Sequence, residues 1–343
     1  MNYWSLCIVC GAFSWFLTGL LHRYALAKNL LDVPNDRSSH SVPTPRGGGI
    51  AIVLTFIVGC GVLVVQEGAS YREIFGLVGA GGIAALIGFI DDHRHIAARW
   101  RLIIHFFAAG WGLYWLGGMP PLMLFDIAFD LGWIGHLLTA VYLVWLLNLY
   151  NFMDGIDGLA GIEAITSGFG AGVVCWLVLS DPLSLAVFLP FLLVASVIGF
   201  LFWNFPPAKI FMGDGGSGFL GLVFGLLSLQ AAWAAPKLFW CWIILLGVFL
   251  VDSTVTLIRR LLHGDKVYEA HCCHGYQYAS RKLGGHKVIS VSVGLINIFW
   301  LTPIASLVAL DWLNALLGLI LAYVPLFWLA AHFKSGAAHL QEV

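Results

Sequence analysis

The stretch at residues 204–218 reads NFPPAKIFMGDGGSG and lies between two long apolar runs, 183–203 and 219–235. A short polar segment in that position is a turn at a membrane face. Its one carboxylate, Asp214, precedes glycines that open the next helix. Backbone N–H groups that converge at such a helix start suit a phosphate, and Mg²⁺ is usually bound by one or two carboxylates together with phosphate oxygens. The alternative is a packing turn, because glycine is frequent in membrane helices.

The composition of the whole chain excludes a soluble domain. Of the 343 residues, 60% are hydrophobic and 10% are charged, and the mean hydropathy is +0.90. The net charge of -1 leaves no broad basic surface, so no nucleic acid is expected as a partner. The seven cysteines do not form the pattern of a disulfide framework. These features indicate a polytopic membrane protein.

The apolar runs predict an all-α integral membrane protein, a polytopic bundle of about eleven transmembrane helices. We interpret residues 1–343 as a single membrane-embedded catalytic domain. A further run, 119–130, is too short to cross a bilayer and is expected at the interface. The expected spans are approximately 4–21, 48–66, 74–90, 101–117, 133–149, 158–179, 183–203, 216–235, 238–258, 288–308 and 312–333.

The basic residues predict the orientation of the bundle. Of the 17 Lys and Arg residues, all but Arg72 and Lys237 fall in one set of loops, which the positive-inside rule makes cytoplasmic. The N-terminus is then periplasmic and the C-terminus cytoplasmic. The cytoplasmic loops 22–47, 91–100, 150–157, 204–215 and 259–287 carry most of the distinctive polar residues and are expected to form the active site. A transporter would keep such groups near the middle of the membrane.

Paired carboxylates recur in these loops. Asp91 and Asp92 end the third expected span, where the helix dipole already places negative charge, so a cation such as Mg²⁺, Lys or Arg would relieve their repulsion. The alternative is a solvated loop with Arg94 as partner. Asp154 and Asp157, in NLYNFMDGIDGLAG at 148–161, would share one side of a helix if the sixth span begins there. N-capping of the sixth helix would explain one of these two carboxylates, but it would not explain the presence of both carboxylates together with Asn151.

Two further loops offer groups that bind anions. The segment DVPNDRSSHSVPTPRGGG at 32–49 provides Arg37, His40 and Arg46, although the arginines also fit membrane anchoring. In the last loop, EAHCCHGYQYASRK, phosphate contacts are expected from His271, His274, Arg281 and Lys282. A zinc site is disfavoured because the usual cysteine spacing is absent. Asp252, in the ninth span, is a functional candidate that could instead pair with Arg259 and Arg260.

Taken together, the motifs resemble those of the polyprenyl-phosphate N-acetylhexosamine-1-phosphate transferases, the WecA/MraY-like membrane enzymes of glycosyltransferase family 4. The motifs are DD, NxxDGxDGLAG, NxxPAKxFMGDxGS and a last cytoplasmic loop that contains histidines, and they run from about Asp32 to Lys287. That last loop reads AHCCHGYQ, which departs from the HIHH and HHHFE forms. It is similar to the AHxxHxYQ form of the WbpL-type O-antigen initiating sugar-phosphate transferases.

The resemblance implies a Mg²⁺-dependent enzyme, with Mn²⁺ as a substitute, in the bacterial inner membrane with its active site facing the cytoplasm. It implies transfer of N-acetylhexosamine-1-phosphate from a UDP-N-acetylhexosamine to undecaprenyl phosphate, which gives UMP and starts O-antigen, lipopolysaccharide or related glycan synthesis. A homodimer is consistent with it. A membrane transporter or flippase of an anionic lipid-linked sugar is the alternative, but it does not explain the clustered carboxylates.

By motif matching, each site residue then receives a role. Asp91 and Asp92 are expected to be catalytic, with Asp91 as the base toward the lipid phosphate. Asp214 and Asp154 are expected to bind the metal, and Arg46, His40 and Arg281 to bind phosphate or the lipid phosphate. The nucleotide-sugar is expected to contact Asn151, Asp157, Asn204, Phe211, His271 and His274, with Phe211 stacking on uracil.

Overall fold

The structure, a computed structural model, describes residues 3–34, 39–40, 42–67, 69–94, 96–124, 127–181, 183–265 and 272–337. These residues form long helices with two short hairpins, as expected for an all-α membrane protein. The helices and strands are α1 (Tyr3–Ala27), β1 (Leu31–Asp32), β2 (Thr44–Pro45), α2 (Gly49–Glu67), α3 (Tyr71–His93), α4 (Ala98–Leu116), β3 (Leu122–Leu124), β4 (Ile127–Phe129), α5 (Gly132–Met153), α6 (Leu159–Val178), α7 (Leu185–Asn204), α8 (Asp214–Ala234), α9 (Lys237–Leu245), α10 (Gly247–Leu262), α11 (Gly275–Lys282), α12 (His286–Ile296), the π-helical η1 (Asn297–Leu301), α13 (Thr302–Ala309) and α14 (Ala315–His332).

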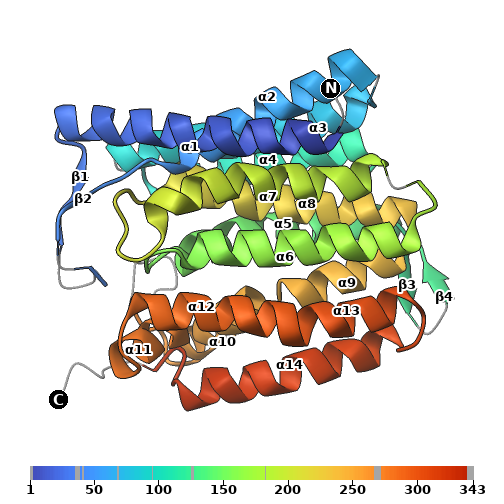
Figure 1. The fold of residues 1–343 in the computed structure, drawn as a ribbon. Helices are drawn as coiled ribbons and strands as arrows, with labels where there is room; N and C mark the ends of the chain where they lie inside the picture. The colour runs from blue at the N-terminus through green and yellow to red at the C-terminus, as the bar shows by residue number, and fades with distance from the viewer. Residues whose placement is uncertain are drawn as a thin grey trace.

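The long helices run side by side between two ends of the molecule (Figure 1). One end carries the β1–β2 hairpin, α11 and the C-terminus, and the other carries the β3–β4 hairpin and the N-terminus. The two termini therefore lie at opposite ends, as the odd number of expected spans requires. The β3–β4 hairpin occupies the short run 119–130 that we expected at the interface.

Within the described residues, nine helices are long and apolar enough to cross a membrane. The number of candidate spans is ten when α9 and α10, which are bent by 70° at their junction, are taken as one broken span. The expectation was eleven. The difference is α4, a 19-residue helix whose sequence includes Arg99, Arg101 and His105 and is therefore less apolar than the others. It nevertheless packs against α3, α5 and α8.

Helix α8 is the most enclosed of the candidate spans, with 89% of its most apolar stretch buried against 22% for α14. Small residues permit this enclosure. A Cβ on Gly88 of α3 would lie 2.5 Å from the backbone of Asp214, so the two helices touch through their backbones. Asp92 follows Gly88 by four residues on the same face of α3. This close contact therefore brings the Asp92 carboxylate to the start of α8.

Candidate active site

A cavity of about 210 Å³ opens at the end of the bundle that carries β1, β2 and α11. Its walls come from five separate regions of the chain. Five of the lining residues are aspartates, and four of these, all except Asp32, are among the site residues proposed from the sequence. The lining residues are Asp32, Ser39, His40, Arg46, Asp92, Asn151, Asp154, Gly155, Ile156, Asp157, Asn204, Phe211, Gly213, Asp214, Gln277 and His286. Nine of the thirteen side chains proposed from the sequence to form the site thus line one cavity.

Asp92 is held by the first turn of α8. Its Oδ1 accepts a hydrogen bond from the backbone N–H of Asp214 at 3.2 Å, and its Oδ2 accepts one from Gly215 at 3.4 Å. These N–H groups have no partner within their own helix, so the carboxylate caps them and gains from the helix dipole. Gly213 makes the approach feasible, because its φ is +78° and a Cβ there would lie 2.6 Å from Asp92 Oδ2.

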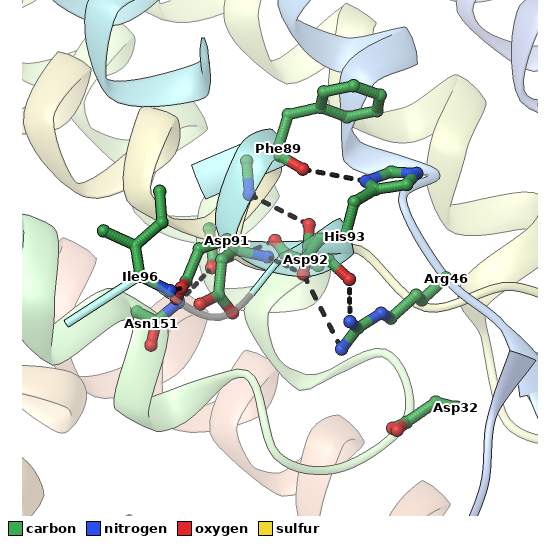
Figure 2. A network of polar contacts seen from close by, with 12 residues as sticks. Asp32, Arg46, Phe89, Asp91, Asp92, His93, Ile96 and Asn151 are labelled. Carbon is green, nitrogen blue, oxygen red and sulfur yellow. Dashed lines mark hydrogen bonds and ion pairs between the residues drawn. The ribbon is translucent and has the colours of Figure 1, made fainter. Parts of the chain in front are cut away.

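Arg46 binds Asp92 from the other side. Its guanidinium donates to the backbone carbonyl of Asp92 and lies 3.9 Å from the carboxylate (Figure 2). The backbone next to Arg46 pairs with the loop before α8, since Phe211 N donates to Pro45 O at 2.8 Å and Gly48 N donates to Phe211 O at 2.9 Å. The 32–49 segment is therefore attached to the 204–215 loop, which fixes Arg46 beside the cavity.

Asp91 points away from Asp92. Its Oδ1 accepts the backbone N–H of Ile96 at 2.7 Å (Figure 2). Its Oδ2 forms an ion pair with Arg101. Arg101 also lies 3.6 Å from Asp214 Oδ2, so one guanidinium links the two carboxylates. Asp91 is not among the residues that line the cavity. Of the two adjacent aspartates, Asp92 is the one that faces the cavity.

Asp154 and Asp157 lie in the turn between α5 and α6 rather than on the first turn of α6, which begins only at Leu159. The Asp157 Oδ2 accepts the backbone N–H of Ala208 at 3.0 Å, and its Oδ1 lies 3.2 Å from His286 Nδ1. Burial alone would raise the pKa of Asp157, but the hydrogen bonds from His286 and Ala208 lower it below its usual value.

Asp154 has the opposite environment. The described residues provide no hydrogen bond or ion pair to its carboxylate, which is half-buried in the cavity wall. Burial and the negative charges of Asp214, Asp92 and Asp157 raise the pKa of Asp154 well above its ordinary value. A carboxylate in this position is stabilised by a cation that also neutralises its neighbours.

This uncompensated negative charge fits a divalent ion. No group of three His, Cys, Asp or Glu side chains in the described part of the chain forms a ready metal cage. Mg²⁺, however, usually takes one or two protein carboxylates and completes its shell with water and substrate phosphates. Asp154 and Asp214 line the same cavity and match this donor set. The site therefore suits an ion that binds together with a phosphate-bearing substrate.

Asn204 and Phe211 also line the cavity. Asn204 is buried, and its carboxamide accepts from Gly158 N at 3.0 Å and donates to Ile210 O at 3.0 Å. It thereby joins the turn before α6 to the loop before α8. Phe211 meets His40 edge to face with 4.8 Å between ring centroids, and both line the cavity. Asn151 donates to Ser217 Oγ at 3.1 Å and so lies over the first turn of α8.

Two further expected residues, His274 and Arg281, do not line the cavity, and a third, His271, is outside the described residues. His274 is buried at the start of α11 and does not line the cavity, and burial lowers its pKa. Arg281 is exposed near the end of α11 and does not line the cavity either. The last loop reaches the cavity instead through Gln277 and, just after it, through His286.

Four residues at the site are not predicted by the sequence motifs. They are Asp32, Gln277 and His286, which line the cavity, and Arg101, which pairs with Asp91 and Asp214. His286 follows Gly284 and Gly285 at the start of a span on the same face as the other motifs, which is a signal that could have identified it. Arg101 stands ten residues after Asp91, and its position in the sequence indicates only a cytoplasmic flanking charge. The pairing of His286 with Asp157 connects residues 129 apart and has no local signal.

Comparisons with known proteins find one matching family model and several similar membrane transferases. The family model described as Glycosyl transferase family 4 matches residues 74–232. A probable undecaprenyl-phosphate N-acetylglucosaminyl 1-phosphate transferase of Bacillus subtilis is 31% identical over 307 residues, which cover 87% of this chain and 83% of the relative. An undecaprenyl-phosphate alpha-N-acetylglucosaminyl 1-phosphate transferase of Thermotoga maritima is 25% identical, covering 83% of this chain and 85% of the relative.

A second branch is also similar. A phospho-N-acetylmuramoyl-pentapeptide-transferase of Oceanobacillus iheyensis is 31% identical over 256 residues, which cover 67% of this chain and 74% of the relative. The names of all three relatives describe 1-phosphate or phospho-sugar transfer, and two of them name undecaprenyl phosphate.

Proposed function

This chain belongs to glycosyl transferase family 4, and from that premise we propose that it transfers N-acetylhexosamine-1-phosphate from a UDP-sugar to undecaprenyl phosphate. The products are undecaprenyl-diphospho-sugar and UMP. Among donors we favour UDP-N-acetylglucosamine, because two relatives that cover most of the chain are named for N-acetylglucosaminyl 1-phosphate transfer. The product would initiate a cell-envelope glycan, and the resemblance of the AHCCHGYQ loop makes O-antigen our specific proposal.

The observation that carries this proposal is the convergence of Asp92, Asp154, Asp157 and Asp214 on one cavity beside Arg46. Both reactants carry phosphates, so binding them together requires cationic groups, and the developing charge must be offset during transfer. The cavity lies at the end of apolar helices, where a lipid phosphate in the membrane and a nucleotide in water can both reach it. We infer that this end faces the cytoplasm.

We propose a single displacement. An oxygen of the lipid phosphate attacks the β-phosphorus of the UDP-sugar, a new P–O bond forms, and the bond between the β-phosphorus and the bridging oxygen breaks so that UMP leaves. Arg46 and Arg101 are positioned to attract the phosphates. Asp92 is the carboxylate available to keep the lipid phosphate deprotonated, whereas Asp91 fixes Arg101.

Mg²⁺ bound by Asp214 and Asp154 would neutralise phosphate charge when present. The chain's own groups would orient the donor. Phe211, in edge contact with His40, offers a face for uracil, and the Asp157–His286 pair and Asn151 contact the nucleotide side. Asn204 acts by joining the two loops rather than by touching substrate, because its carboxamide is already used by Gly158 and Ile210.

The test is release of UMP by purified protein supplied with UDP-N-acetylglucosamine, undecaprenyl phosphate and Mg²⁺. We expect UMP and a lipid-linked sugar in equal amounts, with none formed by Asp214→Asn. Asp311→Asn is a matched control, because Asp311 pairs with Lys237 outside the cavity. Movement of lipid-linked sugar across proteoliposomes without UMP release would support the transporter instead. A panel of UDP-sugars identifies the donor.

A further inference from the structure

Asp252 is a buried carboxylate in α10 that lies outside the cavity. The sequence suggested that it pairs with Arg259 or Arg260. In the structure, both arginines contact other groups: Arg259 donates to the Ser335 carbonyl at 2.8 Å, and the Arg260 guanidinium lies 3.7 Å from the Asp265 carboxylate. Asp252 instead faces the start of α11, a helix that is distant from it in sequence.

The Asp252 carboxylate caps α11 from the side. Its Oδ1 accepts the backbone N–H of Gly275 at 2.9 Å, and its Oδ2 accepts that of Tyr276 at 3.0 Å. These are the first two residues of α11. A charged acceptor on two N–H groups at a helix N-terminus makes strong hydrogen bonds and gains from the helix dipole. Thr256 Oγ1 donates to Asp252 Oδ1 at 3.3 Å, which fixes the carboxylate on α10.

The first turn of α11 also contacts the loop that carries Asp154. The Tyr276 hydroxyl donates to the Phe152 carbonyl at 3.0 Å. Gly155 leaves room for this contact, because a Cβ there would lie 2.1 Å from the Tyr276 hydroxyl oxygen. Gln277 is next in sequence and lines the cavity, and its Oε1 accepts the backbone N–H of His274 at 3.3 Å. The Gln277 Nε2 lies next to Gly155, because a Cβ on Gly155 would be 3.3 Å from it.

We propose that Asp252 is a positioning residue for the nucleotide-sugar. By capping α11, Asp252 holds Tyr276 against the 152–155 turn and keeps the Gln277 carboxamide in the cavity wall. In that position, the Gln277 carboxamide hydrogen-bonds the phosphate or sugar of the donor. The inference rests on the proposed function, since it assigns a further contact in that site. Asp252 itself does not touch the substrate. Its effect is transmitted through the backbone of Gly275 and Tyr276.

The geometry predicts a specific kinetic signature. Asp252→Asn keeps the shape of the side chain but can accept only one of the two N–H groups, and it turns an NH₂ toward the other. We expect the KM for the UDP-sugar to rise about tenfold while the KM for the lipid phosphate stays within about twofold. Gln277→Ala should give the same split, because it removes the donor contact directly. Tyr276→Phe should show it more weakly and with a small change in Tm.

The double variant Asp252→Asn/Tyr276→Phe tests whether the two residues act along one route. Residues coupled through a shared contact are not additive, so the double variant should raise the donor KM no more than Asp252→Asn alone. A purely structural role would lower Tm and the amount of active protein without changing the donor KM. Asp311→Asn serves as the control for loss of a carboxylate outside this connection.

An unchanged donor KM in folded Asp252→Asn, or multiplied effects in the double variant, would overturn the proposal. If Asp252→Asn does not fold, Gln277→Ala and Tyr276→Phe decide, and unchanged donor KM values in both would overturn it. Wild-type protein that binds UDP-N-acetylglucosamine in a thermal-shift titration but releases no UMP would refute the proposed function alone. Reduced donor binding by Gln277→Ala in that titration would still support the positioning role.

Discussion

Single residues decide whether the cavity can assemble, and Gly213 is the clearest case. Its φ of +78° is disfavoured for any residue with a side chain, and a Cβ would meet Asp92 Oδ2 at 2.6 Å. Gly213→Ala should therefore move Asp92 off the N–H groups of α8 and lower kcat/KM by on the order of 10²-fold. Steady-state UMP release measures the effect.

The control for Gly213 is Gly284, whose φ is +94° but whose Cβ would meet no atom within 4 Å. Gly284→Ala introduces comparable backbone strain without a clash at a carboxylate. It should lower Tm modestly and leave kcat/KM close to that of the wild type. Equal losses of activity in the two variants would mean that strain, and not the position of Asp92, is responsible.

Asp154 should determine the metal requirement. Its carboxylate is surrounded by Asp92, Asp157 and Asp214, whose charges together with burial raise its pKa, and the described residues supply no cation to it. Asp154→Asn keeps the size but removes the charge that attracts Mg²⁺. The Mg²⁺ concentration for half-maximal activity should rise by on the order of tenfold or more. An unchanged Mg²⁺ titration would remove Asp154 from the metal site.

Asp157 should make the folding stability of the protein decrease as the pH becomes acidic. Its pKa in the folded protein lies below the usual value of about 3.9, because its hydrogen bonds from His286 and Ala208 outweigh burial. A lowered carboxyl pKa contributes stability above the unfolded pKa, and this contribution is lost as the pH falls through the folded pKa. Asp157→Asn should have a lower Tm at pH 6 but a smaller further decrease at pH 3. Parallel Tm curves would contradict this.

At the scale of helices, the contact between α3 and α8 aligns the site. Gly88 allows the backbone of α3 to touch that of Asp214, and a Cβ there would lie 2.5 Å from the Asp214 carbonyl. We predict that Gly88→Ala separates the helices and lowers activity by at least about tenfold, with a lower Tm. Gly82 of the same helix is the control, since its Cβ would meet nothing within 4 Å. Gly82→Ala should retain activity and stability.

Hydropathy found the helices but not their irregularities. Each expected span corresponds to an observed helix or to consecutive helices, such as α12, η1 and α13 for the span 288–308, because apolar runs of membrane length have few alternatives in a bilayer. The 70° bend between α9 and α10 was missed, although Gly247 stands at the break. The run at 238–258 reads as a continuous apolar segment, and the bend depends on packing against other helices. α4 has the length of a span, but Arg99 and Arg101 in its first turn lower its mean hydropathy.

Sequence spacing identified most of the cavity but not its internal pairing. Asp92, Asp154, Asp157 and Asp214 stood out because carboxylates are unusual in an apolar chain, and the structure places all four on one cavity. Which aspartate of the 91–92 pair faces the cavity depends on the rotation of α3, which Gly88 sets through α8. The contacts of Asp252 with Gly275 and Tyr276 are likewise tertiary. No local pattern encodes such partners.

For the whole molecule, the orientation of the bundle leads to a prediction about membrane vesicles. The cavity lies at the end that carries the C-terminus, and 15 of the 17 Lys and Arg residues lie in loops assigned to that side, with only Arg72 and Lys237 on the other. Because basic loops remain in the cytoplasm, the cavity should open there. UDP-sugars do not cross a bilayer unaided, so their access depends on which face is outside.

Inside-out vesicles that contain the protein and undecaprenyl phosphate should therefore release UMP as soon as UDP-N-acetylglucosamine and Mg²⁺ are added outside. Right-side-out vesicles should do so only after permeabilisation. Asp214→Asn in inside-out vesicles controls for UMP made by other enzymes. A cysteine in place of the exposed Arg281 should react with an impermeant thiol reagent in the same vesicles that release UMP. Activity in sealed right-side-out vesicles would place the cavity on the opposite membrane face and contradict the orientation derived from the basic loops.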